Sequence, residues 1–173
     1  MDKALDQNLR LRKLIMRDAA ELFSLVDSNR EHLRPWLPWV DGCTSIADSR
    51  HYIFSSISQD SHNRGFQCAI TLHKRIVGVA GFHPIDWRTR SVALGYWLGR
   101  DHCGHGIATR AVIALTQHAF GRFGLKQVEL RIAETNRRAL ALAERLHLAA
   151  VREVERAERL GEHWVNHIVY AAR

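Results

Sequence analysis

The segment from Leu98 to Thr109 combines residue types that could bind an anionic ligand. An apolar run that predicts a strand ends at Leu98, the loop GRDHCGHG follows, and a helix is predicted to begin near Ile107. Gly104 and Gly106 have no Cβ, so the backbone can approach a ligand closely there. The first N–H groups of a helix lack partners and lie at the positive end of its dipole. Such a helix start suits a pyrophosphate, although an ordinary turn between strand and helix shows the same pattern.

Other sites that this loop could form fit its residues less well. It lacks the Lys-Ser/Thr pair of a P-loop and the third glycine of a dinucleotide fingerprint, which disfavours binding of a nucleoside triphosphate or NAD. His102, Cys103 and His105 could suggest a metal site. Three ligands within four residues of one loop seldom close a tetrahedron, and no fourth ligand is close in the sequence. We therefore expect no metal.

The whole stretch GYWLGRDHCGHGIATRAV, residues 95–112, resembles the coenzyme A motif of the GNAT superfamily of N-acetyltransferases. It resembles in particular the bacterial ribosomal-protein N-terminal acetyltransferases, which share a W-L-x-W segment, here residues 36–39. They also share an N-x-x-(S/A) helix start, here residues 136–139. The resemblance covers about residues 9–170 and implies one catalytic domain over 1–173. It further implies acetyl-CoA as the co-substrate and an amine as the acceptor.

The resemblance assigns residues to a cofactor site and to an acceptor site. In the family the sheet splays beside the strand that corresponds to residues 93–98, and backbone groups there pair with the pantetheine arm. Asn136 would touch the cofactor, and it could also cap its own helix. Two tryptophans would border the acceptor cleft, unless both are core residues. The assigned cofactor residues are Leu98, Gly99, Cys103, Gly104, His105, Gly106, Ile107, Ala108 and Asn136, and the acceptor residues are Trp36, Leu37 and Trp39.

Acetylation of an amine needs a base for the nucleophile, a donor for the thioester carbonyl and a proton source for the thiolate. Glu158 is the candidate base, because its position matches a glutamate proposed for this role in the ribosomal-protein subgroup. Charged residues of both signs surround it, so a solvated strand edge is the alternative. The family expectation for the carbonyl donor is an N–H near Gly99. The family's Ser or Tyr acid positions hold Ala139 and Ala143, which leaves the acid unassigned.

Hydrophobic periodicity predicts the elements that must position these residues. The N-cap of the first helix is predicted at Asp18, and two prolines exclude a regular helix from the segment LRPWLPWV. A turn is expected at residues 73–74. The alternation of strands and helices predicts an α/β (α+β) fold with a mixed sheet flanked by helices, mostly antiparallel by the resemblance. Strands are expected at 8–14, 66–71, 75–82, 91–98, 127–133, 149–154 and 163–170, and helices at 18–30, 45–59, 107–123 and 136–146.

Composition limits the function classes less than the motifs do. The chain has 173 residues and 46% hydrophobic content, enough for one domain with a core. Its net charge of +7 is spread along the sequence, which suits nucleic acid, an anionic cofactor or an acidic surface. No predicted helix gathers a basic stripe, so we expect no direct binding of nucleic acid. A basic enzyme would also bind an acidic protein more readily than a polyamine.

The remaining expectations concern location and alternatives. No window has the length of a membrane span, the N-terminal residues do not form a secretory signal, and three cysteines lack C-x-x-C spacing. We expect a cytoplasmic protein with reduced thiols and no membrane partner, and leave a homodimer open. The acceptor could be a protein N-terminus or a small amine such as a polyamine, an antibiotic or a metabolite. A non-catalytic acyl-CoA sensor is the competing function.

Overall fold

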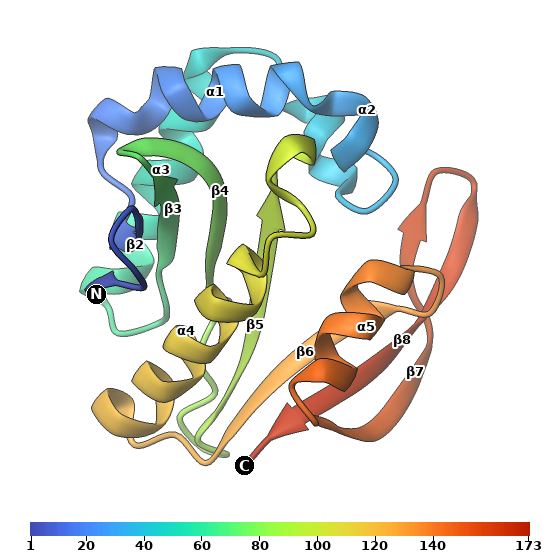
Figure 1. The fold of residues 1–173 in the computed structure, drawn as a ribbon. Coiled ribbons are helices and arrows are strands. Elements are labelled where there is room, and N and C mark those ends of the chain that lie inside the picture. The colour runs from blue at the N-terminus through green and yellow to red at the C-terminus, as the bar shows by residue number, and fades with distance from the viewer.

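The computed structural model describes all 173 residues, and its strands form one eight-stranded sheet (Figure 1). The strand order is β1-β2-β3-β4-β5-β6-β8-β7, and every neighbouring pair is antiparallel except β5 with β6. This confirms the predicted mixed, mostly antiparallel sheet flanked by helices. The strands are β1 (Asp2–Ala4), β2 (Leu9–Lys13), β3 (Gln67–Leu72), β4 (Arg75–Phe82), β5 (Ser91–Leu98), β6 (Gln127–Ala133), β7 (Ala149–Leu160) and β8 (His163–Ala172).

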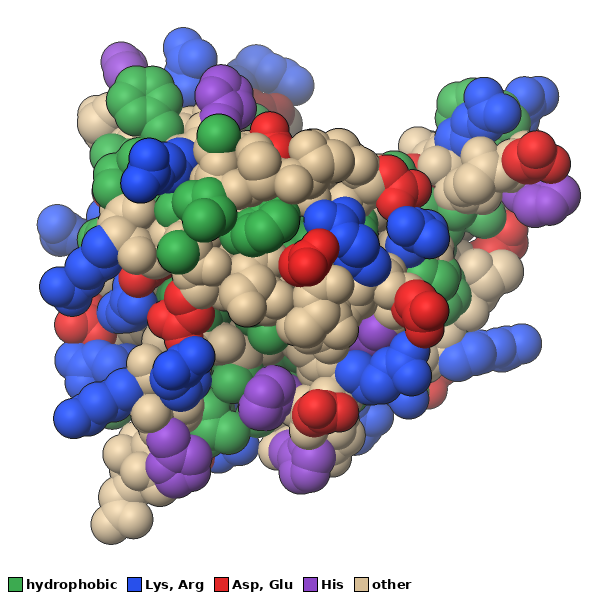
Figure 2. Space-filling model, turned by 90° about the horizontal axis from the view of Figure 1, so that it is seen from above, with side chains coloured by type: hydrophobic (Ala, Val, Ile, Leu, Met, Phe, Trp, Pro, Cys, Tyr) green, Lys and Arg blue, Asp and Glu red, His purple; other side chains and the backbone are tan.

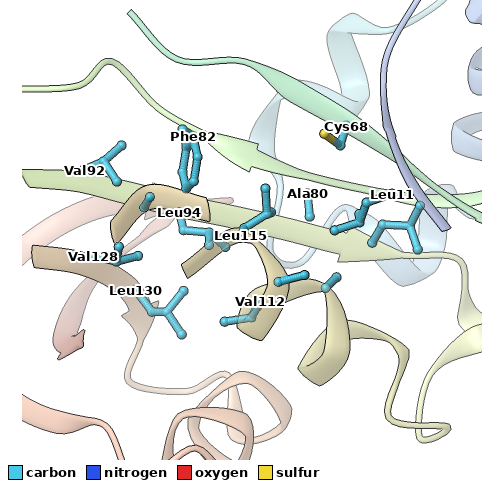
Figure 3. Close-up of a cluster of buried hydrophobic side chains, with 14 of the residues drawn as sticks. Leu11, Cys68, Ala80, Phe82, Val92, Leu94, Val112, Leu115, Val128 and Leu130 are labelled. Carbon is cyan, nitrogen blue, oxygen red and sulfur yellow. The ribbon is translucent and has the colours of Figure 1, made fainter. Parts of the chain in front are cut away.

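The helices cover both faces of the sheet, and each face has its own core. The larger core joins the sheet to α4 and α5, and Figure 3 shows Leu115 of α4 close to Leu94 of β5. The smaller core packs α1 and α3 against the opposite face. None of the helices is both long and apolar enough to cross a bilayer. The helices are α1 (Ala19–Ser28), α2 (Arg30–Leu33), α3 (Ile46–Ser61), α4 (Ile107–Phe123) and α5 (Arg137–Arg145), with short 3-10 turns at η1 (Met16–Asp18), η2 (Pro38–Gly42) and η3 (Arg100–His102).

The sheet opens between its two central strands. The parallel pairing of β5 with β6 ends at Ala93 and Glu129, although β5 continues to Leu98 and β6 to Ala133. Beyond that point β5 stays paired with β4, whereas β6 stays paired with β8. Figure 1 shows the two strands diverging toward the end of the molecule that carries α2. The result is a wedge-shaped gap in the middle of the sheet.

Most of the predicted elements are present, and the differences have local causes. β1 was not predicted, because it is a short, exposed edge strand without apolar alternation. Asp18 is the N-cap residue of α1 as predicted, but its carboxylate accepts hydrogen bonds from Arg12 and from the Ile15 N–H and none from the first turn of α1. β7 runs beyond the predicted end at Val154, because a bulge before Glu158 keeps the strand paired with β8.

Candidate active site

A groove of about 2280 Å³ lies along the gap between β5 and β6. Its walls come from α2, the segment around η2, the loop before α4, the first turns of α5 and the β7–β8 hairpin. Figure 2 views the molecule from above Figure 1, with the β7–β8 side at the right, where charged side chains project beyond the main body. Because the gap passes through the sheet, the groove can be reached from both of its faces. One is the face that carries α4, and the other we call the acceptor face.

The loop before α4 presents unpaired backbone N–H groups. The N–H groups of residues 104–109 donate to no acceptor in the protein, whereas that of Cys103 donates to the Arg100 carbonyl at 3.2 Å. Gly104 and Gly106 have φ values of +84° and +70°, and no atom lies within 4 Å of the place a Cβ would occupy at either. This left-handed geometry favours glycine and turns the amides outward at the start of a 17-residue helix. The arrangement fits a phosphate group.

Basic side chains that the sequence patterns did not predict line the groove beside this amide cradle. Arg100, Arg137, Arg138 and Arg145 all line the groove. Arg138 and Arg145 are seven residues apart on α5, so they lie on the same face of that helix. The spacing of arginines in RRALALAER could have indicated this. The cradle and these guanidinium groups together suit a ligand with several phosphates.

The backbone of β5 has hydrogen-bonding groups free along the gap. His83 donates to the Ala93 carbonyl, and Gly99 donates to the Val77 carbonyl at 2.9 Å. Because strand residues alternate in direction, the backbone groups of Tyr96 and Leu98 point the other way, toward β6. Pairing with β6 has already ended there. The Gly99 N–H is thus engaged in the sheet, whereas the N–H of its neighbour Leu98 faces the gap. Neither Gly99 nor His105 lines the groove.

The start of α5 closes one side of the groove. The Asn136 side-chain oxygen accepts the Ala139 N–H at 3.2 Å, which confirms Asn136 as the cap of this helix. Asn136 also lines the groove, as do Leu98, Cys103, Ile107 and Ala108. Ala139 and Ala143, which occupy the family's acid positions, lie in different environments. Ala139 lines the groove, whereas Ala143 is fully buried in the larger core.

Aromatic side chains form the wall near η2. Trp36, Leu37 and Trp39 all line the groove, as the resemblance implied for an acceptor cleft. Trp39 is 45% exposed and Trp36 is half-buried, so neither tryptophan is a core residue. Trp39 stacks on Tyr52 with ring centroids 6.5 Å apart and lies 6.0 Å from the Trp97 ring. The wall is rigid, apolar and open to a ligand.

Glu158 and His167 form a hydrogen-bonded pair in the groove. The Glu158 carboxylate lies 3.2 Å from His167 Nε2, and both residues line the groove. The Glu158 side chain is 35% exposed and that of His167 is 15% exposed. The bulge in β7 places Glu158 opposite Val165, two residues before His167 on β8. No sequence pattern predicted a role for His167, because only the strand pairing brings it to Glu158.

Three other titratable groups line the groove on the side of the amide cradle. Burial raises the pKa of Tyr96 to about 12, so its hydroxyl stays protonated at neutral pH and can donate a hydrogen bond. Burial, with the nearby charges of Arg100 and Arg138, lowers the pKa of His32. The Cys103 sulfur lies 3.6 Å from His32 Nε2. All three cysteines are free thiols, and no group of three or more side chains is arranged to hold a metal ion.

Comparisons with known proteins find similarity to acetyltransferases in both sequence and fold. The family model described as an acetyltransferase (GNAT) domain matches residues 8–149. A putative ribosomal N-acetyltransferase of Bacillus subtilis is 26% identical over 82% of this chain and 78% of its own length. The ribosomal-protein-serine acetyltransferase of Escherichia coli is 27% identical over 65% of this chain and 63% of its own.

A solved structure of a ribosomal L7/L12 alpha-N-protein acetyltransferase in complex with coenzyme A superposes with a TM-score of 0.95. It is 23% identical, and the match covers 99% of this chain and 97% of that one. The fold is therefore shared, and the family model extends over most of the sequence. The chain belongs to the GNAT family of acetyltransferases and is an enzyme that uses acetyl-CoA as its acetyl donor.

Proposed function

We propose that this enzyme acetylates the N-terminal amine of a protein, with a ribosomal protein as the acceptor class. The observation that carries the proposal is the arrangement of one groove across two faces of the sheet. The amide cradle opens on the α4 side, and Glu158 with the aromatic wall lies on the acceptor face. The Bacillus subtilis and Escherichia coli relatives, whose names refer to ribosomal acceptors, support the acceptor class.

Acetyl-CoA would bind with its phosphates at the free N–H groups of residues 104–109 and its pantetheine arm in the gap. Arg138 and Arg145 would add charge to the phosphate site, and Cys103 and Asn136 would line it. The arm would pair with the backbone of Tyr96 and Leu98, whose hydrogen-bonding groups point into the gap. The N–H of Leu98, next to Gly99, would polarise the thioester carbonyl.

Glu158 would act as the general base. Its carboxylate would take a proton from the attacking amine, directly or through a water molecule, as the nitrogen bonds to the thioester carbon. The hydrogen bond from His167 would hold the carboxylate in place. Trp36, Leu37 and Trp39 would pack against the first residues of the acceptor. No side chain at position 139 or 143 can protonate the departing thiolate, so we assign no residue to that step.

We further propose that residues 1–173 work as one catalytic domain in the cytoplasm. A continuous hydrogen-bonded sheet from the first strand to the last supports the single domain. Three free cysteines and ribosomal relatives support a reducing compartment.

The test is calorimetric titration with acetyl-CoA beside NAD and ATP, followed by an acceptor screen read by mass spectrometry. The screen would contain N-terminal peptides of ribosomal proteins, the same peptides with blocked N-termini, and small amines including spermidine. We expect transfer to the free α-amine of peptides. Transfer to small amines alone would overturn the N-terminal proposal, and binding of acetyl-CoA with no turnover on any amine would instead favour the sensor.

A further inference from the structure

A buried carboxylate holds two arginines on the acceptor face of the sheet. Glu129 on β6 is 6% exposed and accepts two parallel hydrogen bonds from Arg152, at 2.9 and 3.0 Å. It also accepts longer bonds of 3.2 and 3.3 Å from Arg131 and one of 2.8 Å from Gln127. Each arginine therefore has a fixed orientation, and some of its guanidinium N–H groups remain free to donate to a ligand.

The network carries a net positive charge. Burial alone would raise the pKa of Glu129, but hydrogen bonds and charge from Arg152, with Gln127 and Arg131, lower it below its usual value. One negative charge is thus set against two guanidinium groups. The side chain of Arg131 is 55% exposed and that of Arg152 is 45% exposed, and both line the groove. Two half-exposed cations are therefore available to a ligand in the groove.

The strand register places these arginines on the same face as the candidate base. Arg131 and Arg152 pair with Val169 from either side, and Val169 between them is fully buried. His167 lies two residues back along β8, and Val165, which pairs with Glu158, lies two further back. Alternate residues of a strand share a face, and four residues span about 13 Å. The arginine pair thus lies about 13 Å along the face from the Glu158 position.

Other charged groups at this end of the groove do not cancel the positive charge. Lys126 and Arg173 also line it and are basic, whereas burial lowers the pKa of His83, so that ring is neutral at neutral pH. Asp86 lines it too, but its carboxylate already accepts the N–H groups of residues 88 and 89 in a turn. Acidic groups are therefore few and occupied, and an anionic ligand group is favoured.

We propose that Arg131 and Arg152 form a subsite for a carboxylate of the acceptor, the side chain of an Asp or Glu at the second to fourth residue. The inference rests on the proposed function, because it assumes a peptide whose amine lies at Glu158. An extended peptide advances about 3.4 Å per residue, so a side chain in that range reaches the pair. The subsite selects N-termini that carry an acidic residue just behind the acetylated amine.

The test uses synthetic octapeptides that share an N-terminal serine and differ only by Asp, Asn, Lys or phosphoserine at the third residue. Each is titrated calorimetrically into protein saturated with coenzyme A, and acetylation is measured separately with acetyl-CoA. We expect the Asp peptide to bind about fivefold more tightly than the Asn peptide, and the Lys peptide to bind most weakly. Equal affinities for the Asp and Asn peptides would overturn the subsite. If the protein bound the phosphoserine peptide but not the Asp peptide, the proposal of a carboxylate ligand would be wrong.

Variants then locate the subsite. Arg131→Gln removes the more exposed arginine and leaves the two bonds from Arg152 to Glu129, so the sheet should keep its stability. In this variant we expect the ratio of the affinities for the Asp and Asn peptides to fall close to one. The control is Arg17→Gln, a change at an exposed position outside the groove, which should leave that ratio as in the parent. Thermal unfolding and acetyl-CoA affinity report on folding. An unchanged ratio in both Arg131→Gln and Arg152→Gln would refute the assignment.

The two proposals can fail separately. Absence of acetylation on every peptide would refute the proposed N-terminal acetylation. The affinity ratio between the Asp and Asn peptides is measured without turnover and by itself decides whether the arginine pair recognises a carboxylate.

Discussion

On the α4 side of the gap, the centre of the site is a row of backbone amides from one short loop, with arginine side chains of α5 beside it. On the acceptor face the site consists of side chains from distant segments. The cradle uses consecutive residues from 104 to 109, and glycine conformation alone keeps it open. The acceptor face combines Trp39 with groups from β6, β7 and β8, among them Glu158 and His167. A site made of backbone is encoded locally, and a site made of side chains depends on strand register.

The comparison also predicts which changes each side tolerates. Loop side chains of the cradle can vary as long as the glycines keep their positive φ values, because the amides carry the binding. On the acceptor face each side chain has its own role, and the backbone serves to position these side chains. Substitutions should therefore affect acetyl-CoA affinity on one side, and turnover or acceptor affinity on the other. Each of the following variants tests this division, starting with the largest expected effect.

Glu158→Gln should lower kcat by about a hundredfold, because a general base of this kind contributes about that factor or more. Acetyl-CoA affinity should stay near that of the parent, since Glu158 lies on the acceptor face. The measurement is steady-state turnover at neutral pH beside calorimetry. Glu155→Gln, the same change at an exposed position of β7 outside the groove, is the control. Equal kcat values for Glu158→Gln and the parent would remove Glu158 from the mechanism.

Gly104→Val should weaken acetyl-CoA binding by about tenfold, because a side chain at φ +84° strains the loop and turns its amides away. Gly161→Val is the matched control. Gly161 also has a positive φ, of +61°, with open space around its Cβ position, but it lies in the β7–β8 turn outside the groove. Both variants should lose about 1–2 kcal/mol of stability, yet only Gly104→Val should lose affinity in a titration. Similar affinities for the two variants would place the phosphates elsewhere.

Trp39→Ala should raise the KM for a peptide acceptor by about fivefold, because an exposed aromatic wall contributes apolar contact without chemistry. The KM for acetyl-CoA should change little. Trp87→Ala serves as control, since Trp87 is 46% exposed, close to the 45% of Trp39, and lies outside the groove. Steady-state kinetics, with the peptide and acetyl-CoA varied in turn, give both KM values. If the two variants gave the same peptide KM, the wall would not bind the acceptor.

The smallest effect concerns the pH dependence of stability on the acceptor face. The pKa of Glu129 is lowered in the folded protein, so its ionised form contributes stability above the unfolded pKa of about 4.5. That contribution is lost as the pH falls through the lower folded value. Glu129→Gln should therefore flatten the decline in stability at acid pH, in urea unfolding measured from pH 7 down to 3. If the free energy of unfolding of the variant fell as steeply as that of the parent, other carboxylates would account for the loss of stability at acid pH.

Local sequence determined most elements and the whole of the cradle. Apolar periodicity predicted β5 from Ser91 to Leu98 and α4 from Ile107 to Phe123 with the observed bounds. The positive φ values at His73 and Lys74 confirm the expected turn. These features depend on residues close in the sequence, where backbone sterics and the spacing of apolar side chains act directly.

Only the tertiary structure decided which groups meet in the gap. Pairing with β4 engages the Gly99 N–H and turns the groups of Tyr96 and Leu98 toward the opening. Packing buries Ala143 while Ala139 faces the groove. The bulge in β7 brings Glu158 to His167, and cross-strand pairs place Arg131 beside Arg152. Such outcomes depend on hydrogen bonds between strands far apart in the chain, and no local pattern of residues specifies that register.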